Sequence, residues 1–508
     1  MLPLTLGILV AIMAPIYTHK ILLFPMDHQA HVNSFSIIGA ELQSRGHAVD
    51  IIVADRSKHL AMQRGITTLV RSYQNVLDSS IFEHASTGGM SAQRDYIKTL
   101  YKTALEQTTY NCNDKDFIAQ LKNANYDLML VEGSDLGRVQ LLLPYKLDVP
   151  FVTISIRHAP WQVRIPSLPS VEGLQGIKLL DKNSTFFDRL LNTLAWLVVE
   201  NFIAPPSFMS KVNETLFDVL VPERENIGFM ALLRKAEIFL TLLDIYCTDV
   251  HRISAPHYKL IGALGGKDPD PLPNELKEFM DSAKHGVIVL SFGSGMKRIR
   301  KELLDPMLET FKGLKQKVVM RHDGDLPEAV PSNVLIQKWL PQNDLLAHPN
   351  TKLFITHCGS NGQTEAVYHG VPMLMLPGMI DQFYNARRAE AKGYGLVIDT
   401  RTFQLYEFKQ KLNEMLTNPA YYEATKKCSR ILHSLPSPQN TAAFWIEHVL
   451  HHGSDHLKPY YLDMPWYKFW MLDIIAFISV MVVLMIFAVK MCCVKLCCGS
   501  ATPKSKRD

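Results

Sequence analysis

Short apolar runs alternate with helical patterns along the first half of the chain. The residues from Lys20 to Phe24 form an apolar run, positions 34–44 follow a helical period, and the residues from Ala48 to Val53 form a second run. The same rhythm returns near 127–131 and 150–155. Short apolar strands that alternate with helices are typical of parallel βαβ units. The first half is therefore predicted to be a doubly wound α/β domain.

A cluster of glycines and prolines, GALGGKDPDPLP at 262–273, interrupts this rhythm. It lacks hydrophobic periodicity and is typical of a linker. Beyond it, further strands are predicted at 287–290, 317–320, 334–336, 352–355 and 371–376. The predicted fold class is α/β, with two Rossmann-like domains facing a cleft at the carboxyl ends of their strands. Their predicted bounds are 19–263 and 276–450, joined by a linker over 264–275.

The chain begins with an apolar run from Leu4 to Met13. This run is too short to span a bilayer and suits the core of a secretory signal peptide. We predict a signal peptide over residues 1–18, with a first buried strand as the alternative.

Near the other end, positions 474–489 carry no charge and follow a group of aromatic residues. This pattern predicts a juxtamembrane segment over 451–467 and a transmembrane helix over 468–489. Lysines and an arginine dominate the charges of the tail, 490–508, so the positive-inside rule places the tail in the cytosol and the large domains in the lumen. The protein is thus expected to be a single-pass type I membrane protein.

The tail ends KSKRD, with lysines three and five residues from its end. This spacing resembles the dilysine retrieval signal of endoplasmic-reticulum membrane proteins, so we expect localisation to that membrane. A tail that merely satisfies the positive-inside rule is the alternative. Four cysteines beside the predicted span are candidates for palmitoylation: Cys492, Cys493, Cys497 and Cys498.

Composition narrows the class of protein. The chain has 508 residues, a net charge of +4 and 47% hydrophobic residues, which excludes a nucleic-acid-binding or disordered protein. Four cysteines precede the predicted span, too few for a disulfide scaffold. Sequons at Asn183 and Asn213 fit a lumenal position. A hydrophobic stretch from Phe186 to Ile203 contains charges, so it is predicted to line an acceptor pocket or to rest on the membrane surface.

The second domain concentrates the candidate chemistry. In LFITHCGSNGQTE, His357 follows a strand, Gly359 lies in the turn, and a helix starts near Asn361. Backbone N–H groups at a helix start favour a diphosphate. Ser291 and Ser294 end the domain's first predicted strand and face this cradle, and Arg321 ends the next.

A nucleoside and a sugar have candidate partners in the same region. Trp339 follows a strand and offers a ring that stacks on uracil. Gln342 and Glu365 are available for ribose hydroxyls, and Asp381 with Gln382 for the hydroxyls of a sugar. Together these residues predict a nucleotide-sugar site.

The segment from 339 to 382 resembles the signature of UDP-glycosyltransferases, specifically the membrane-bound metazoan UDP-glucuronosyltransferases of the GT-B fold. RGH at 45–47, LPNELKEF at 272–279 and SFGS at 291–294 extend the resemblance over most of the chain. The resemblance implies phosphate contacts at Ser291, His357 and Asn361. It implies uracil and ribose contacts at Trp339, Gln342 and Glu365. It implies contacts with the sugar at Asp381 and Gln382. Cys358 departs from the pattern, because the family commonly has glycine there.

Catalysis requires a base near the acceptor. By its spacing to RGH, His31 matches the family's base, and neutral imidazole removes the proton of a hydroxyl as it attacks the sugar. His28 is the alternative base. A carboxylate is expected to orient the imidazole, and both Glu132 and Asp135 fit the position that the resemblance implies.

The resemblance implies that a sugar is transferred with inversion from a UDP-sugar to a small lipophilic acceptor. Glucuronic acid is the leading candidate for this sugar. The product is a β-glycoside. No cofactor or metal is expected, and the DxD patterns at 268–270 and 323–325 are assigned to the linker and a turn. UDP-glucose, UDP-galactose and UDP-N-acetylhexosamine are alternative donors, and a non-catalytic binding protein is the alternative class. The sequence leaves a homo-oligomer open.

Overall fold

The computed structural model describes most of the two predicted domains and the predicted membrane helix. The described residues are 18–73, 89–156, 158, 162–165, 184–198, 209–243, 247, 254–293, 295–296, 298–326, 329–379, 381–469 and 471–498. The predicted signal peptide up to position 17, Ser294 and the predicted retrieval signal lie outside these residues.

The first sheet has seven parallel strands in the order β3-β2-β1-β4-β5-β6-β7. The strands are β1 (Lys20–Phe24), β2 (Ala48–Ala54), β3 (Thr67–Arg71), β4 (Leu128–Glu132), β5 (Phe151–Ser155), β6 (Phe239–Thr241) and β7 (Tyr258–Leu260). The helices of this part are α1 (Gln29–Ser44), α2 (Lys58–Met62), α4 (Gly89–Asn113), α5 (Lys115–Asn123), α6 (Leu142–Leu147), α7 (Phe186–Val198), α8 (Met209–Leu220) and α9 (Phe229–Arg234).

The second sheet has six parallel strands in the order β10-β9-β8-β11-β12-β13. The strands are β8 (Val287–Ser291), β9 (Lys317–Arg321), β10 (Val334–Gln337), β11 (Thr351–Thr356), β12 (Met373–Met375) and β13 (Gly395–Val397). The helices are α10 (Asn274–Asp281), α11 (Lys301–Lys312), α12 (Gln342–Ala347), α13 (Ser360–His369), α14 (Gln382–Ala391), α15 (Leu405–Thr417), α16 (Pro419–Ser434) and α17 (Pro438–His452). The predicted pair of parallel α/β sheets is confirmed.

Both sheets are covered on two faces, which explains the continuous apolar runs of their central strands. Every residue of β4, β5 and β8 is buried. Side chains on a strand alternate between faces, so a run without polar interruptions requires helices above and below the sheet. Each sheet accordingly has two apolar clusters, one on either face.

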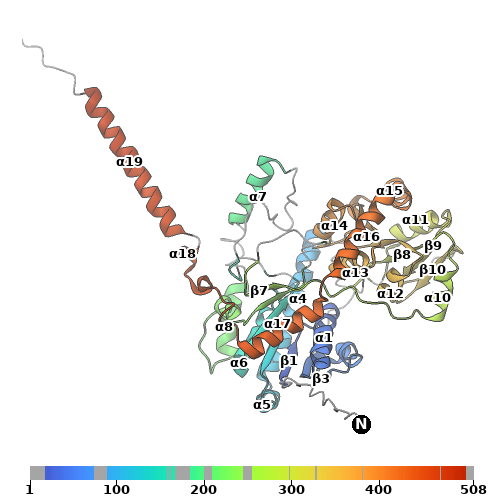
Figure 1. The fold of residues 1–508 in the computed structure, drawn as a ribbon, viewed down its shortest axis with the longest axis horizontal. Coiled ribbons are helices and arrows are strands. Elements are labelled where there is room, and N and C mark those ends of the chain that lie inside the picture. The colour runs from blue at the N-terminus through green and yellow to red at the C-terminus, as the bar shows by residue number, and fades with distance from the viewer. Residues whose placement is uncertain are drawn as a thin grey trace, which may run out of the picture. The chain divides into compact units, whose positions relative to one another are not determined.

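Helix α17 lies almost entirely within the range predicted for the second domain, 276–450, yet it packs on the first sheet. Ala442 and Ile446 share an apolar cluster with Ile21 of β1. Arg45, at the end of α1, donates from Nη1 to Glu447 at 2.8 Å. Figure 1 shows α17 beside α1 and β1. This helix, near the end of the predicted second domain, therefore returns to the first domain.

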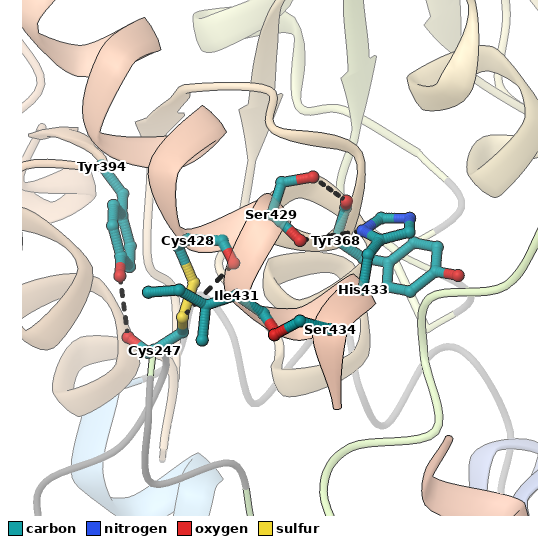
Figure 2. Close-up of a disulfide and its surroundings, with 8 residues drawn as sticks. All are labelled: Cys247, Tyr368, Tyr394, Cys428, Ser429, Ile431, His433 and Ser434. Atoms are coloured by element: carbon teal, nitrogen blue, oxygen red, sulfur yellow. Dashed lines mark hydrogen bonds between the residues drawn. A yellow bond between two sulfur atoms is a disulfide. The ribbon is translucent and has the colours of Figure 1, made fainter. Parts of the chain in front are cut away.

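A disulfide also joins the two halves. Cys247, beyond β6, is bonded to Cys428 on α16, 181 positions later. Figure 2 shows this bond together with Tyr394, whose hydroxyl donates to the carbonyl of Cys247 at 3.1 Å. Cys247 belongs to the buried apolar cluster of the second sheet. The disulfide therefore ties the position of Cys247, which follows β6 of the first sheet, to α16 of the second half.

Residues 458–508 form a separate unit. Its helices are α18 (Trp466–Phe469) and α19 (Leu472–Cys498), and Met471 between them has a positive φ of 53°. Within the described part of the chain, one helical stretch, Leu472–Lys495, is long and apolar enough to cross a membrane. It begins four positions later than the predicted span and continues beyond 489, because no helix-breaking residue follows Lys490 before position 499.

Candidate functional site

The predicted donor contacts lie along one edge of the second sheet. Ser291 ends β8 and Arg321 ends β9, whereas His357 directly follows β11. Strand β8 pairs with β9 on one side and β11 on the other, and Ser291 is opposite Thr356. Because all these strands are parallel, their carboxyl ends meet at one edge. The strand order reverses direction at β8, and such a switch point is where α/β sheets bind ligands.

His357 is held between two glycine turns. A Cβ atom on Gly293 or on Gly359 would lie 2.6 Å from an atom of the His357 ring, so neither position has room for a side chain. Gly293 also has a φ of +74°, a conformation that L side chains rarely adopt. The turn glycines therefore let the backbone close around the imidazole.

The His357 imidazole is neutral at physiological pH. Burial lowers its pKa to about 4. Its Nδ1 atom is buried and has no hydrogen-bond partner among the described residues. A neutral ring donates from one nitrogen, which suits a hydrogen bond to a phosphate oxygen. The first turn of α13, which includes the exposed Asn361, begins three residues later at Ser360.

Trp339, the residue predicted to stack on uracil, forms a cation–π pair with Arg321. The guanidinium of Arg321 lies 4.9 Å from the centroid of the Trp339 ring. Arg321 Nε donates to the Lys338 carbonyl at 3.1 Å, and its Nη1 donates to the carbonyl of Gly293. Trp339 remains 60% exposed, which leaves ring surface for stacking. Arg321 thus supports Trp339 and the phosphate-side turn at once.

The two residues predicted for ribose are directly bonded. Gln342, the first residue of α12, donates from Nε2 to Glu365 Oε2 at 2.6 Å. Burial raises the pKa of Glu365 to about 7, although the bond from Gln342 opposes this shift. The carboxyl is therefore available both as an acceptor and, when protonated, as a donor.

The two residues predicted for the sugar differ in role. Gln382 is buried, and its Oε1 accepts from the amides of Gly378 at 2.9 Å and Met379 at 3.1 Å, so it shapes the loop after β12. Asp381 accepts from Asn385 at 2.8 Å, and burial raises its pKa. Sequence reasoning missed Asn385, whose spacing of four from Asp381 on a helix is the available signal.

The same loop reaches the first half of the chain. Met379 belongs to one buried cluster with Leu22 and Tyr96. Burial and, second, the charge of Asp381 raise the pKa of the Tyr96 hydroxyl to about 12. Residues of the first domain therefore lie beside the loop predicted to hold the sugar.

The first domain holds a histidine–carboxylate pair. His31, in the first turn of α1, is 2.6 Å from Oε2 of Glu132, measured from its Nδ1. Glu132 ends β4, its side chain is 1% exposed, and its Oε1 accepts from the amide of Ser134 at 3.0 Å. Because a carboxylate only accepts, Nδ1 carries the proton and Nε2 is left to accept another.

In this pair, the charges and hydrogen bonds around His31 and Glu132 together have a larger effect on both pKa values than burial has. Burial alone would lower the pKa of His31, but the charge and hydrogen bond of Glu132 together raise it. Burial would raise the pKa of Glu132, but His31 and the hydrogen bonds from Ser134 lower it. The pair is thus an oriented base next to a stable anion.

Asp135 and His28 occupy other positions. The Asp135 side chain is 59% exposed and bonds to Arg138 and Gln162. His28 caps α1, since its Nδ1 accepts from the amide of Ala30 at 3.3 Å, and burial lowers its pKa to about 3. Of the two carboxylates left open by the sequence, the structure places Glu132 against His31.

A second network holds the turn before α1. Asp27 is buried and accepts from Arg56 Nη2 at 2.6 Å and from Ser57 Oγ at 3.1 Å. Its amide donates to Gln107 Oε1 at 3.2 Å. These partners come from distant parts of the sequence, and no local pattern identifies them. The network fixes the position from which His31 projects.

One aspartate of each DxD pattern forms an ion pair with a lysine side chain. Asp270 pairs with Lys267, and Asp323 lies 3.3 Å from Lys338. Both pairs are largely exposed.

Solved structures with a similar fold are glycosyltransferases. The glycosyltransferase of kitacinnamycin matches with a TM-score of 0.60 and 20% identity, covering 85% of this chain and 99% of that chain. The calicheamicin glycosyltransferase CalG4 matches with a TM-score of 0.60 and 17% identity, covering 86% and 99%. The fold is therefore the two-domain GT-B fold.

Sequence comparison defines the family. The chain belongs to the UDP-glucoronosyl and UDP-glucosyl transferase family, which matches residues 19–507. It is 30% identical to UDP-glucuronosyltransferase 2B17 of Homo sapiens, over 96% of each chain. It is 31% identical to UDP-glucuronosyltransferase 2C1 of Oryctolagus cuniculus, over 92% of this chain and 96% of that protein. The predicted membership and the predicted UDP-glycosyltransferase activity are confirmed.

Proposed function

We propose that this enzyme transfers glucuronic acid from UDP-glucuronic acid to a hydroxyl group of a small lipophilic acceptor, with inversion to a β-glucuronide. The observation that carries the reaction is the His31–Glu132 pair, joined at 2.6 Å with Nε2 left to accept a proton. The choice of sugar rests on relatives described as UDP-glucuronosyltransferases.

In the proposed mechanism, Nε2 of His31 removes the acceptor proton as the oxygen attacks the anomeric carbon. The carboxylate of Glu132 holds the ring orientation and stabilises the imidazolium that forms. UDP leaves from the opposite face of the sugar. Because the acceptor enters opposite the leaving group, an α-linked donor gives a β-linked product.

The leaving group is proposed to bind at the edge of the second sheet. Neutral His357, Ser291 and the amides at the start of α13, near Asn361, stabilise the charge that develops on UDP. Trp339 stacks on uracil, and Gln342 with Glu365 binds ribose. Asp381 and Gln382 complete the site at the sugar. We propose that this arrangement needs no metal ion.

The enzyme is proposed to reside in the endoplasmic-reticulum membrane. Helix α19 supplies the span, the catalytic domains are lumenal, and the basic tail is cytosolic. The exposed apolar residues of α7, among them Phe187 and Leu191, support a lipophilic acceptor that enters from the membrane surface.

A donor panel tests this function. Membranes that contain the protein are given a phenolic acceptor with UDP-glucuronic acid, UDP-glucose, UDP-galactose or UDP-N-acetylglucosamine, and products are identified by mass spectrometry and NMR. The expected product is a β-glucuronide plus UDP. Glucose is the second candidate sugar, since the family description includes UDP-glucosyl transfer. An α-linked product, or transfer from none of the donors, would contradict the proposal.

A further inference from the structure

The side-chain amide of Asn385 connects two loops of the proposed donor site. Asn385 lies in α14 and is 5% exposed. Its Nδ2 donates to Asp381 Oδ2 at 2.8 Å and to the carbonyl of Cys358 at 3.2 Å. Its Oδ1 accepts from Nη2 of Arg388 at 3.0 Å. The amide thus spans from the loop after β12 to the turn after β11.

The partners determine which way the amide points. An amide nitrogen donates twice and accepts nothing, and here it faces a carboxylate and a carbonyl. The amide oxygen faces the guanidinium of Arg388, which only donates. Reversing the amide would oppose like groups at all three contacts. Arg388 thus acts together with Asp381 and the Cys358 carbonyl to favour the orientation in which Asn385 donates toward the donor site.

Asn385 connects two groups whose orientation affects the proposed donor site, the Cys358 carbonyl and the Asp381 carboxylate. Cys358 has a φ of 60°, which is uncommon for a residue with a side chain, and its amide donates to Thr356 Oγ1 at 3.2 Å. Its carbonyl belongs to the peptide bond that supplies the amide of Gly359, at the start of α13. Fixing that carbonyl fixes the same peptide plane. At the other end, the Asp381 carboxylate is fixed in position.

We infer that Asn385, oriented by Arg388, is a positioning residue that sets the sugar-binding carboxylate of Asp381 relative to the phosphate-binding turn at Cys358. This inference rests on the proposed function, because it assigns the sugar to Asp381. Asn385 acts through Asp381 and the turn. Its loss is expected to weaken binding of a UDP-sugar more than binding of UDP.

Electrostatics support the same assignment. Burial raises the pKa of Asp381, whereas the hydrogen bond from Asn385 and the charge of Arg388 both lower it. These two residues therefore favour the ionised carboxylate, which is the stronger acceptor for sugar hydroxyls. The Arg388 guanidinium lies 4.8 Å from the centroid of the Tyr384 ring, which holds it in place.

Three substitutions on α14 separate this role from general effects on the fold. Asn385→Asp keeps the shape and the acceptor for Arg388, but it turns an oxygen toward Asp381 and the Cys358 carbonyl. Arg388→Gln removes the group that orients the amide. Arg387→Gln is the matched control, since Arg387 is exposed on the same helix.

The experiment measures binding of UDP and of the UDP-sugar that wild type binds most tightly, by calorimetry on the full-length protein in detergent. For Asn385→Asp we expect the Kd of the UDP-sugar to rise about tenfold or more and that of UDP about threefold. Arg388→Gln should raise the UDP-sugar Kd about threefold, and Arg387→Gln should match wild type. In turnover, KM for the donor should rise more than kcat falls.

Two results would overturn the inference. One is an Asn385→Asp variant whose UDP-sugar Kd lies within twofold of the Arg387→Gln control. The other is an equal loss of UDP and UDP-sugar affinity. Failure of the proposed function looks different, because wild type would then bind a UDP-sugar without transferring its sugar, while the binding ratios would still report on Asn385.

Discussion

His31 and Glu132 lie 101 positions apart in sequence, yet their side chains meet at 2.6 Å. Helix α1 starts at Gln29, after a short turn that follows β1, and Glu132 ends β4, the neighbour of β1 in the first sheet. Two adjacent parallel strands therefore deliver the imidazole and its carboxylate to the same edge. This pairing is the structural basis of the proposed general base.

Glu132→Gln should lower kcat/KM for the acceptor about 10²-fold or more, because the imidazole loses the anion that stabilises its protonated form. The pH dependence has a definite sign. Glu132 raises the pKa of His31, so its neutralisation should lower that pKa and move the acid limb of the profile to lower pH. Initial rates from pH 5 to pH 9 check this.

Asp135→Asn is the matched control for that profile. Its carboxylate is largely exposed and bonds elsewhere, so both the rate and the acid limb should stay near those of wild type. A larger effect of Asp135→Asn than of Glu132→Gln would show that Asp135, and not Glu132, is the carboxylate that supports His31.

Gly293→Ala should weaken UDP binding about tenfold or more, since its Cβ would displace the His357 ring. Gly65→Ala is the matched control for Gly293→Ala. Gly65 has a similar φ of +72° but no atom within 4 Å of the added Cβ. Both variants should lose about 1 kcal/mol of stability from backbone strain, and Gly65→Ala should bind UDP normally. Equal UDP affinity in the two variants would refute a role for His357.

Binding of uridine should strengthen as the pH rises from 6 to 8. The pKa of Glu365 is raised to about 7, so the carboxylate that accepts ribose hydroxyls forms over this range. Uridine is used because it lacks phosphate groups that titrate. Calorimetry should show a Kd that falls a few-fold in wild type and stays constant in Glu365→Gln. A pH-independent Kd in wild type would contradict the assignment.

Cys247→Ser, Cys428→Ser and the double variant should all lower the melting temperature by a similar amount, because each removes the same bond. Removing a disulfide typically costs about 2–5 kcal/mol. Cys492→Ser is the control, since Cys492 is a free thiol in α19. Thermal melts in detergent measure the shift. A double variant with twice the loss of either single variant would show that the two cysteines act independently.

Much of the fold was predictable because buried parallel strands leave a strong pattern. The predicted run from Lys20 to Phe24 coincides with β1, and the predicted strands of the second domain overlap β8 to β12. The three-residue strands β6, β7 and β13 were missed because they are too short to show a period. Strand β3 reads TTLVR and is only partly buried, which weakened its hydrophobic signal.

The site was predictable where its residues follow strand ends, and less so elsewhere. His357 directly follows β11 and Trp339 lies two residues beyond the end of β10, so their edge of the sheet could be inferred. The sequence could not separate Glu132 from Asp135, because the choice depends on which side chain turns toward α1. Arg56 was missed because tertiary packing brings it to Asp27. Asn385 was missed although it lies four positions after Asp381, because its second partner, the carbonyl of Cys358, comes from another loop.

The rate of sugar transfer by His31→Ala, compared with that of His28→Asn, shows whether His31 is the general base. His28→Asn keeps a side chain that can cap α1, so it should retain most of the activity. Both variants are assayed in membranes with saturating UDP-glucuronic acid and a phenol. Wild type should form β-glucuronide, and His31→Ala should form it about 10²-fold or more slowly. Undiminished transfer by His31→Ala would contradict this role of His31.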